Sequence, residues 1–190
     1  MHYKIMNIDL SRGPIVVDNF LNLNDIHEIN RQLDDHRWQY GNRSYETSQN
    51  VFWFQHHYDT DKNLKSRYDF IHTVMSEYIK NKVNLKLRLY RVNANAQTYG
   101  QDGDYHIDYS PPHNTKYMTC IIYLTPTVNK ENAADYGGCI NFDLNDTILS
   151  VQPIFNRAVF FNSTIPHQGV SFNRFETKLR VSLAYVFEVL

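Results

Sequence analysis

A strict alternation of apolar and polar side chains runs along Leu85-Lys86-Leu87-Arg88-Leu89-Tyr90-Arg91. Successive side chains of a strand point to opposite faces, so this pattern predicts a β-strand with one apolar face. We expect the three leucines to face helices from the earlier part of the chain. Lys86, Arg88 and Tyr90 then point into the space that the sheet encloses. The stretch marks the change from a helical region to a β-rich one.

The second half of the chain consists of short apolar stretches separated by turn residues. Clear turn signals are Pro111-Pro112, Gly137-Gly138 and Pro166. Many short strands between such turns are typical of an antiparallel sandwich or barrel, and a double-sheet jelly roll fits this pattern. The further predicted strands cover residues 105–109, 117–124, 139–142, 148–152, 157–162, 167–172 and 178–187.

Two helices are predicted before this β region. Apolar residues recur at helical spacing over 23–35, where Asn22 or Asn24 can serve as the N-cap. The clearer helix covers 61–81, with Asp61 as its expected cap. These helices carry one apolar stripe each, so we expect them to cover one face of a sheet.

The remaining early segments complete the predicted architecture. Residues 14–18 read as a short strand, and the aromatic-rich stretch 36–60 is expected to be irregular. No repeat or linker divides the chain, so we expect a single domain over 1–190. Its parts are a helical support region, 1–83, and a jelly-roll core, 84–190. The predicted fold is mainly β with flanking α: a double-stranded β-helix with N-terminal helices packed on the major sheet.

Composition narrows the classes of function. The chain has 190 residues, 42% of them hydrophobic and 14% aromatic, with a net charge of −1, which argues against disorder. The chain has 19 basic and 20 acidic residues, so it has no excess of positive charge for binding nucleic acid. No signal peptide is visible, and no apolar run reaches the roughly 18–20 residues that span a bilayer.

These features predict a cytoplasmic protein without a membrane or nucleic-acid partner. Cys120 and Cys139 read as buried hydrophobes rather than as a disulfide or a metal site. Glycine is scarce, with 7 residues, whereas tyrosine is common, with 14. Such a bias indicates an AT-rich genome, as in phages and viruses, and the cytoplasm would then be that of the host.

The triplet His106-Ile107-Asp108 is the first candidate for chemistry. Residues i and i+2 of a strand share a face, so the imidazole and the carboxylate project side by side. His167 lies on another predicted strand, after Pro166. Two histidines and one carboxylate are the ligand set that holds non-heme Fe(II) and leaves positions open. Taken alone, the triplet favours a chance pattern or a surface ion pair.

The predicted strand 178–187 changes that balance. Arg180 and Ser182 share the face that points into the barrel. A buried guanidinium is costly unless an anion pairs with it, and a carboxylate ligand suits its bidentate geometry. The alternative is an edge arginine paired with Glu176. Lys178 lies on the same predicted face and is a rival for the carboxylate.

In their order along the chain, these residues resemble the Fe(II)/2-oxoglutarate-dependent dioxygenases, and most of all the prolyl 4-hydroxylase-like branch. The resemblance covers residues 85–187 well and the first 80 in outline. Further segments that resemble the branch, in the same order, are 15–21, 117–124, the Gly-Gly turn at 136–140, and 157–163.

This resemblance implies a metal centre and a reaction. His106, Asp108 and His167 would be the catalytic ligands of Fe(II), within an oxygenase domain whose catalytic core is 84–190. The implied co-substrates are 2-oxoglutarate and O2, with ascorbate as a further candidate cofactor. The implied reaction hydroxylates an unactivated C–H bond while 2-oxoglutarate is decarboxylated to succinate and CO2.

The resemblance also implies a co-substrate site. Arg180, preferred over Lys178, would bind the distal carboxylate of 2-oxoglutarate, and Ser182 could add a hydrogen bond. Tyr123 and Tyr90 match positions where relatives place tyrosines close to that co-substrate.

The substrate is expected to be a peptidyl proline or another protein residue, and the alternative is a free amino acid or small metabolite. The expected walls of its entrance are residues 36–60, 93–104 and 109–116. Aromatic side chains there that could hold a proline-like group are Trp38, Trp53, Tyr99 and Tyr109. His56, His57 and the other histidines outside the triad are interpreted as structural or solvated.

Two other classes of protein share this barrel. One is a non-catalytic jelly-roll binding or virion module, and the other is a cupin-type metalloenzyme. The full set of three ligands with Arg180 argues against a non-catalytic module, because a degenerate copy would have lost one of them. Cupins use more histidines at closer spacing, and Arg180 and Ser182 would then have no role.

Overall fold

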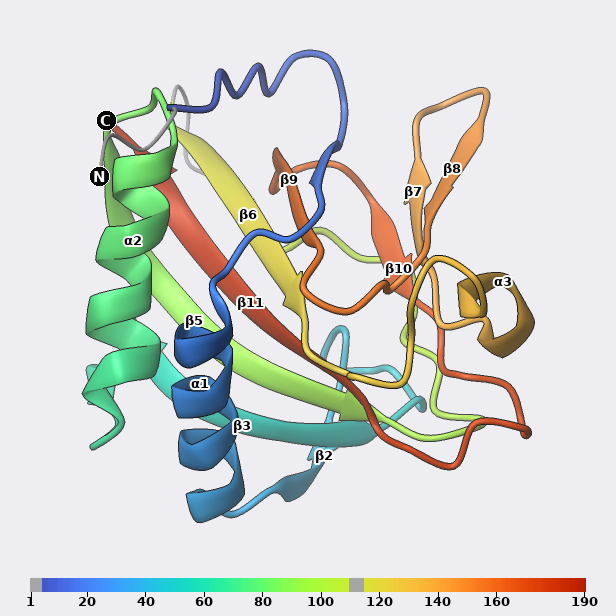
Figure 1. Cartoon of the computed structure of the whole chain (residues 1–190). Coiled ribbons are helices and arrows are strands. Elements are labelled where there is room, and N and C mark those ends of the chain that lie inside the picture. Colours follow the sequence, from blue (N-terminus) through green and yellow to red (C-terminus); the bar gives the residue numbers. More distant parts are fainter. Residues whose placement is uncertain (1–4, 110–114) are drawn as a thin grey trace.

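A large antiparallel sheet forms the centre of the computed structural model, which describes residues 5–109 and 115–190 (Figure 1). The helices α1 (Leu23–Asp35) and α2 (Met75–Lys82) lie against one face of this sheet. The spatial order of its strands is β1 (Ile15–Val17), β9 (Ala158–Asn162), β6 (Lys116–Tyr123), β11 (Arg180–Val189), β5 (Leu87–Gln97), β3 (Phe52–Asp59) and β2 (Gln39–Asn42), with β4 (Leu64–Lys65) paired to β3.

A smaller sheet lies on the side away from α1 and α2 (Figure 1). Its order is β10 (His167–Gly169), β7 (Ile140–Asp143) and β8 (Ile148–Val151), and the short helix α3 (Ala133–Tyr136) precedes β7. Phe142 of this sheet packs on Phe161 of the large sheet, with ring centroids 4.9 Å apart. The two sheets therefore share an apolar core, and the predicted jelly roll with helices on its larger sheet is confirmed.

Helix α1 has the predicted bounds. The Asn22 side chain accepts a hydrogen bond from the backbone N–H of Asp25 at 2.9 Å, which makes it the N-cap. Ile26, Ile29 and Leu33 recur at helical spacing and are buried. Their apolar face, rather than helix propensity alone, holds the helix on the sheet.

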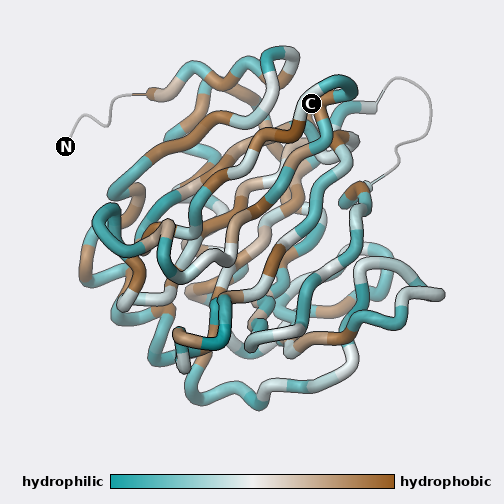
Figure 2. The backbone as a smooth tube through the Cα atoms, turned by 90° about the vertical axis from the view of Figure 1, so that its right-hand side faces the viewer, coloured by the Kyte–Doolittle hydropathy of each residue, from teal (hydrophilic) through white to brown (hydrophobic). Residues whose placement is uncertain are grey.

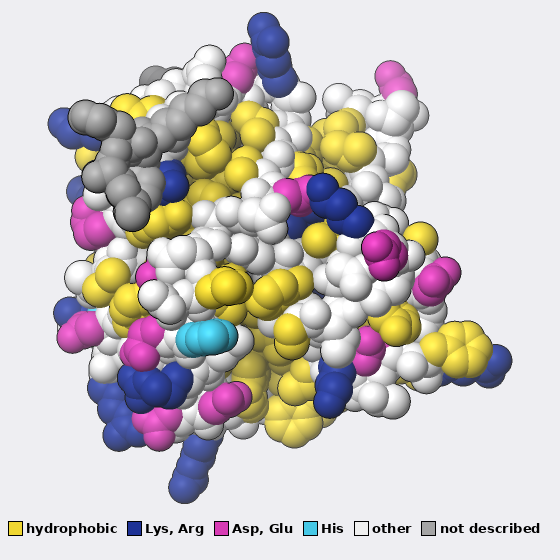
Figure 3. Space-filling model, viewed as in Figure 1, with side chains coloured by type: hydrophobic (Ala, Val, Ile, Leu, Met, Phe, Trp, Pro, Cys, Tyr) yellow, Lys and Arg dark blue, Asp and Glu magenta, His cyan; other side chains and the backbone are white. Residues whose placement is uncertain are grey.

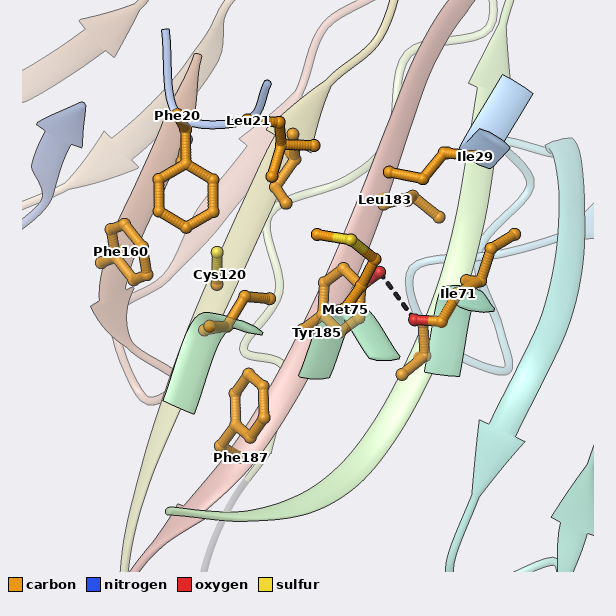
Figure 4. Packing of buried hydrophobic residues seen from close by; sticks show 14 of the residues in the cluster. Phe20, Leu21, Ile29, Ile71, Met75, Cys120, Phe160, Leu183, Tyr185 and Phe187 are labelled. Carbon is orange, nitrogen blue, oxygen red and sulfur yellow. Dashed lines mark hydrogen bonds between the residues drawn. The ribbon is translucent and has the colours of Figure 1, made fainter. Parts of the chain in front are cut away.

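The main core lies between the helices and the large sheet (Figure 4). Ile71 and Met75 pack there against strand residues such as Leu183, and all three are buried. The buried Tyr185 hydroxyl donates to the Ile71 carbonyl oxygen at 2.9 Å. This bond satisfies the one polar atom that the tyrosine brings into the core.

The helix predicted over 61–81 starts later than expected. Residues 64–65 form β4, and the helical segment begins with a π-helical turn, η1 (Phe70–Val74), which continues into α2. Asp61 does not cap a helix, because it accepts a hydrogen bond from the Tyr90 hydroxyl. Pairing with β3 therefore draws the first part of this segment into the sheet.

The expectation that 36–60 is irregular is wrong. This stretch supplies β2 and β3, and β3 pairs with β5 along most of its length. Its alternation is hidden in the sequence because polar Gln55 faces the helices. The Gln55 amide donates to the carbonyl oxygens of Leu33 and His36 at 2.8 and 2.9 Å, at the end of α1. A polar residue in this position breaks the apolar pattern that predicts a strand.

Two further strand predictions are corrected. Residues 105–109 form no regular strand and meet the smaller sheet only through an antiparallel bridge between His106 and His167. Strand β5 begins at Leu87 and passes a bulge near Tyr90, opposite the Val186–Phe187 irregularity of β11. Residues 110–114, with Pro111-Pro112 and His113, lie outside the described residues.

Hydrophobic and hydrophilic residues are divided between the strands and the loops. Hydrophobic stretches run along the inner strands, while the loops are mostly hydrophilic (Figure 2). Basic and acidic side chains are interspersed on the face that carries the helices (Figure 3). Among the described residues, no helix is long and apolar enough to cross a membrane.

Candidate active site

Three side chains from two distant segments meet between the sheets. One ligand atom from each of His106, Asp108 and His167 lies within 4.8 Å of the other two. His106 Nε2 is 3.8 Å from Asp108 Oδ1, and His167 Nε2 is 3.6 Å from Asp108 Oδ2. Two imidazole nitrogens and one carboxylate suit a divalent transition metal and leave coordination positions open.

Backbone contacts fix how both imidazoles face. His106 and His167 exchange backbone hydrogen bonds of 3.0 and 2.9 Å, which bring the two segments together. Nδ1 of His106 lies 2.8 Å from the carbonyl oxygen of Asp104, and Nδ1 of His167 lies 2.9 Å from that of Ile165. Each Nδ1 is therefore the donor, and each Nε2 offers its lone pair to the same point.

Asp108 is held at its backbone and its carboxylate. Its N–H donates to the Ser163 carbonyl oxygen at 3.0 Å. The Thr119 hydroxyl donates to Asp108 Oδ2 at 2.7 Å and is itself 2.8 Å from the Ser163 hydroxyl. Arg91 Nη2 donates to the Asp108 carbonyl oxygen at 3.1 Å and lies 3.6 Å from Oδ1. The Thr119 and Ser163 hydrogen bonds orient the carboxylate before any ligand binds.

The electrostatics keep Asp108 and His167 in metal-binding form. Burial would raise the pKa of Asp108, but His167, Arg91 and His106 outweigh it and hold this pKa below its usual value. Burial lowers the pKa of His167, and the Asp108 carboxylate offsets this only in part. The aspartate is thus ionised and the histidine neutral near pH 7, as metal ligation requires.

A cavity of about 300 Å3 extends from these three residues to Arg180. Arg180 is only 4% exposed, and its Nε donates to the Gly138 carbonyl oxygen at 2.6 Å and its Nη1 to Gln97 Oε1 at 2.8 Å. No carboxylate of a described residue forms an ion pair with it. A buried guanidinium without a counter-ion is costly, so this end of the cavity is built for an anion.

Tyr123 and Ser182 lie close to Arg180, and of the two only Ser182 is among the residues that line the cavity. The Arg180 Cζ lies 5.2 Å from the centroid of the Tyr123 ring. The Tyr123 hydroxyl is buried and makes no hydrogen bond of normal geometry to a described residue, and burial raises its pKa to about 12. Ser182 is 4% exposed and lines the cavity. A neutral phenol, a hydroxyl and a guanidinium can all donate to a carboxylate.

Geometry separates the rival side chains. Lys178 precedes β11 and is exposed, whereas Arg180 opens that strand and faces the cavity. Tyr90 does face away from the leucines, as predicted, but it does not line the cavity. It packs edge-on against Tyr117 and Tyr109, with centroids 5.3 and 4.8 Å away.

Several cavity residues were not singled out individually in the sequence analysis, although the expected wall segments 36–60 and 93–104 do contribute to the lining. His56, expected to be structural, lines the cavity, and its Nδ1 is 2.8 Å from Asn93 Oδ1. Arg91 also lines it, and so do Asn93, Asn95 and Gln97 of the same strand. Alternation of residues 91–97 was the available signal, because Val92, Ala94 and Ala96 alternate with these polar residues.

The four aromatic residues expected at the entrance are not among the residues that line the cavity. Trp38 packs against the main core, and Trp53 packs on Tyr40 with centroids 5.0 Å apart, so neither lines the cavity. Tyr99 is exposed, and the Tyr109 ring packs at a tilt against Tyr117, with centroids 4.0 Å apart. The part of the wall expected from 109–116 falls largely outside the described residues.

Comparison with known proteins agrees with this geometry. The family model of the 2OG-Fe(II) oxygenase superfamily matches residues 92–187, which include all three metal-ligand candidates and Arg180. No curated protein sequence matches the chain.

Solved structures with a similar fold include two prolyl hydroxylases and a protein that binds 2-oxoglutarate. A prolyl-4-hydroxylase of Pseudomonas putida has 20% identity and a TM-score of 0.66, covering 94% of each chain. A Trichoplax adhaerens prolyl hydroxylase, solved with a peptide of hypoxia inducible factor, has 18% identity and a TM-score of 0.66, covering 94% of this chain and 84% of its own. HygX of Streptomyces hygroscopicus, solved with nickel, 2-oxoglutarate and hygromycin B, has 11% identity and a TM-score of 0.59, covering 92% and 82%.

The family match includes His106, Asp108, His167 and Arg180, which all line one cavity. The fold is shared with the prolyl hydroxylases. This chain therefore belongs to the 2OG-Fe(II) oxygenase superfamily, as a 2-oxoglutarate-dependent dioxygenase with Fe(II), 2-oxoglutarate and O2 as its cofactors.

Proposed function

We propose that this chain hydroxylates an unactivated C–H bond, with 2-oxoglutarate decarboxylated to succinate and CO2. The observation that carries this proposal is a single cavity with two ends. His106, Asp108 and His167 stand at one end, and Arg180, which is buried and without a counter-ion, stands at the other. A metal-chelating oxoacid with a distal carboxylate fits both ends at once.

Each residue has a role in this proposal. His106, Asp108 and His167 hold Fe(II), and Thr119 keeps Asp108 in place through its 2.7 Å hydrogen bond. Bound Fe(II) would activate O2, which is the oxidant, and 2-oxoglutarate would supply two of the electrons that reduce it. The histidines and the aspartate would orient the metal, and His167 is the buried member of the set.

The co-substrate end works by charge and hydrogen bonding. Arg180 binds the distal carboxylate of 2-oxoglutarate, and the free Tyr123 hydroxyl and Ser182 donate to it. Gln97 and the Gly138 carbonyl oxygen hold the guanidinium in position before the ligand arrives. Such preorganisation reduces the entropy lost on binding.

The domain assignment and the substrate belong to the same proposal. We infer that residues 1–190 work as one oxygenase domain, because β1, β2 and β3 belong to the same sheet as the later strands. A peptidyl proline or other protein residue is one substrate class, supported by the fold shared with a prolyl hydroxylase that was solved with a peptide. A small molecule is the other, and the cavity wall bears on that choice below.

An anaerobic titration tests the proposal. We would add Fe(II) and then 2-oxoglutarate to the purified protein and record the weak visible charge-transfer band of an iron–oxoacid chelate. His106→Ala should abolish the band, and His27→Ala, at an exposed position of α1, should leave it unchanged. A folded wild-type protein without the band would refute the proposal and favour a non-catalytic jelly-roll module.

A further inference from the structure

The cavity wall formed by β5 and β3 is polar. Strand register places Ser182 of β11 beside Asn95, and Ala184 beside Asn93, whose other neighbour is His56. The next pair in this register joins Val186 to Arg91, and Arg91 lines the cavity. One side of the cavity therefore carries a row of polar side chains on β5, formed by Asn95, Asn93 and Arg91, which we call the polar ladder.

Several donors on this ladder are not used within the protein. Asn93 Oδ1 pairs with His56 at 2.8 Å, and Asn95 Oδ1 accepts from Asn42 at 3.4 Å. The side-chain N–H groups of Asn93 and Asn95 have no hydrogen-bond partner among residues 5–109 and 115–190. Unused donors that face a cavity favour a ligand with oxygen acceptors.

The charged side chains on this side of the cavity also favour a ligand with oxygen acceptors. The cations Arg43, Lys62 and Arg91 line the cavity here, against the one carboxylate of Asp59. Asp59 is already engaged, since it accepts from the Lys62 backbone N–H at 3.1 Å and lies 3.7 Å from Lys62 Nζ. A cavity with excess positive charge attracts an anion.

Arg91 is the best placed of these cations. Its side chain is 27% exposed, and only Nη2 is used, on the Asp108 backbone carbonyl and carboxylate. Asp59 is its direct partner across β3 and β5, yet the two side chains form no ion pair. The remaining guanidinium N–H groups are therefore available beside a metal ligand, where a substrate must lie to react.

The wall is poorly suited to an internal proline. Its apolar members on this side are Phe52 and Ile107, and the aromatic residues expected to hold a proline-like ring lie elsewhere. A proline inside a peptide offers no anionic group to Arg91. The polar ladder instead matches a molecule whose own carboxylate and polar groups are free.

We propose that the acceptor substrate is a small carboxylic acid, such as a free amino acid, and that Arg91 binds its carboxylate. Asn93 and Asn95 donate to its other polar groups, and Lys62 adds positive charge at the rim. This inference rests on the proposed function, since it names the substrate class of the same site.

Binding to the protein loaded anaerobically with Fe(II) and 2-oxoglutarate tests the inference without turnover. The probes are the free L-amino acids, the methyl ester of each one that binds, and a proline-containing peptide blocked at both ends. Isothermal titration calorimetry gives affinity, and the visible band gives the integrity of the metal and co-substrate site. We expect at least one free acid to bind, and its ester to bind at least tenfold more weakly.

Variants then locate the contact. Arg91→Gln should weaken the free acid at least tenfold while the band still forms, and Arg91→Lys should restore part of the affinity. Arg88→Gln is the matched control, because Arg88 lies on the same strand, is 68% exposed and pairs with Glu188. It should change neither measurement.

Failure of the inference and failure of the proposed function give different results. Absence of the band from the wild-type protein removes the proposed function. A normal band overturns the inference alone if no acid binds more tightly than its ester, or if the blocked peptide binds more tightly than the acids. Loss of the band in Arg91→Gln also overturns it, since Arg91 would then be a positioning residue for Asp108.

Discussion

Replacement of Arg180 by methionine tests the co-substrate site quantitatively. Arg180 is 4% exposed and donates only to Gln97 and the Gly138 carbonyl oxygen, so the bound carboxylate would be its sole counter-ion among the described residues. Removing one partner of a buried ion pair costs about 3–5 kcal/mol. At about 1.4 kcal/mol per tenfold, the Kd of 2-oxoglutarate should rise roughly 100- to 5,000-fold.

The same substitution should have little effect on the folded state without ligand. Two acceptors lose their donor, at about 1–3 kcal/mol each if they stay unsatisfied. The variant also avoids the desolvation of a buried guanidinium, which is several kcal/mol in the opposite direction. We therefore expect a Tm within about 4 °C of the wild-type value.

Calorimetric titration of 2-oxoglutarate into the Fe(II)-loaded, oxygen-free protein measures the effect. Lys178→Met is the matched control, because Lys178 is exposed just before β11 and was the rival in the sequence. It should bind 2-oxoglutarate as the wild type does. A change of less than tenfold in Arg180→Met, or a large loss in Lys178→Met, would refute this assignment.

Three further predictions concern the metal centre, the acid limit of stability and the Gly-Gly turn. Thr119→Val should weaken Fe(II) roughly 10- to 100-fold in a metal titration, because the Asp108 carboxylate loses its 2.7 Å hydrogen bond; unchanged affinity would count against an orienting role. Burial lowers the pKa of His57 in the folded protein to about 3, whereas its pKa in the unfolded chain is about 6.5. Between these two pH values His57 is protonated only in the unfolded chain, so the free energy of unfolding should fall as the pH falls from about 6.5 to about 3. Urea titrations across this range check the slope, which His57→Gln should flatten. Gly138→Ala should lower the Tm, because a Cβ there would lie 2.5 Å from the Phe172 ring and the residue has φ +75°. It should also lower the affinity for 2-oxoglutarate, because the Gly138 carbonyl oxygen accepts a hydrogen bond from Arg180. A variant with normal 2-oxoglutarate binding would show that this turn does not position Arg180.

The neighbours of the metal ligands show why some site residues could not be predicted. His56 and Arg91 line the cavity because β3, β5 and β11 pair in one register, and the segments concerned are far apart in the chain. Tyr90 matched an expected position, but it packs with Tyr117 outside the cavity. A bulge near Tyr90 shifts the alternation, and a period of two cannot reveal where such a shift falls.

Local pattern was enough for features that depend on neighbours in the chain. Helix 23–35 with its Asn22 cap and the inward Arg180 follow from short-range spacing. His106 and Asp108 do meet as expected, but residues 105–109 form no regular strand, so the bridge to His167 rather than strand periodicity places this segment. Strand pairing decided the rest: it drew 36–60 and 64–65 into the sheet and brought His167 to the pair. The physical reason is that side-chain direction is set by the local backbone, whereas the partner across a cavity is set by which strands pair and in what register.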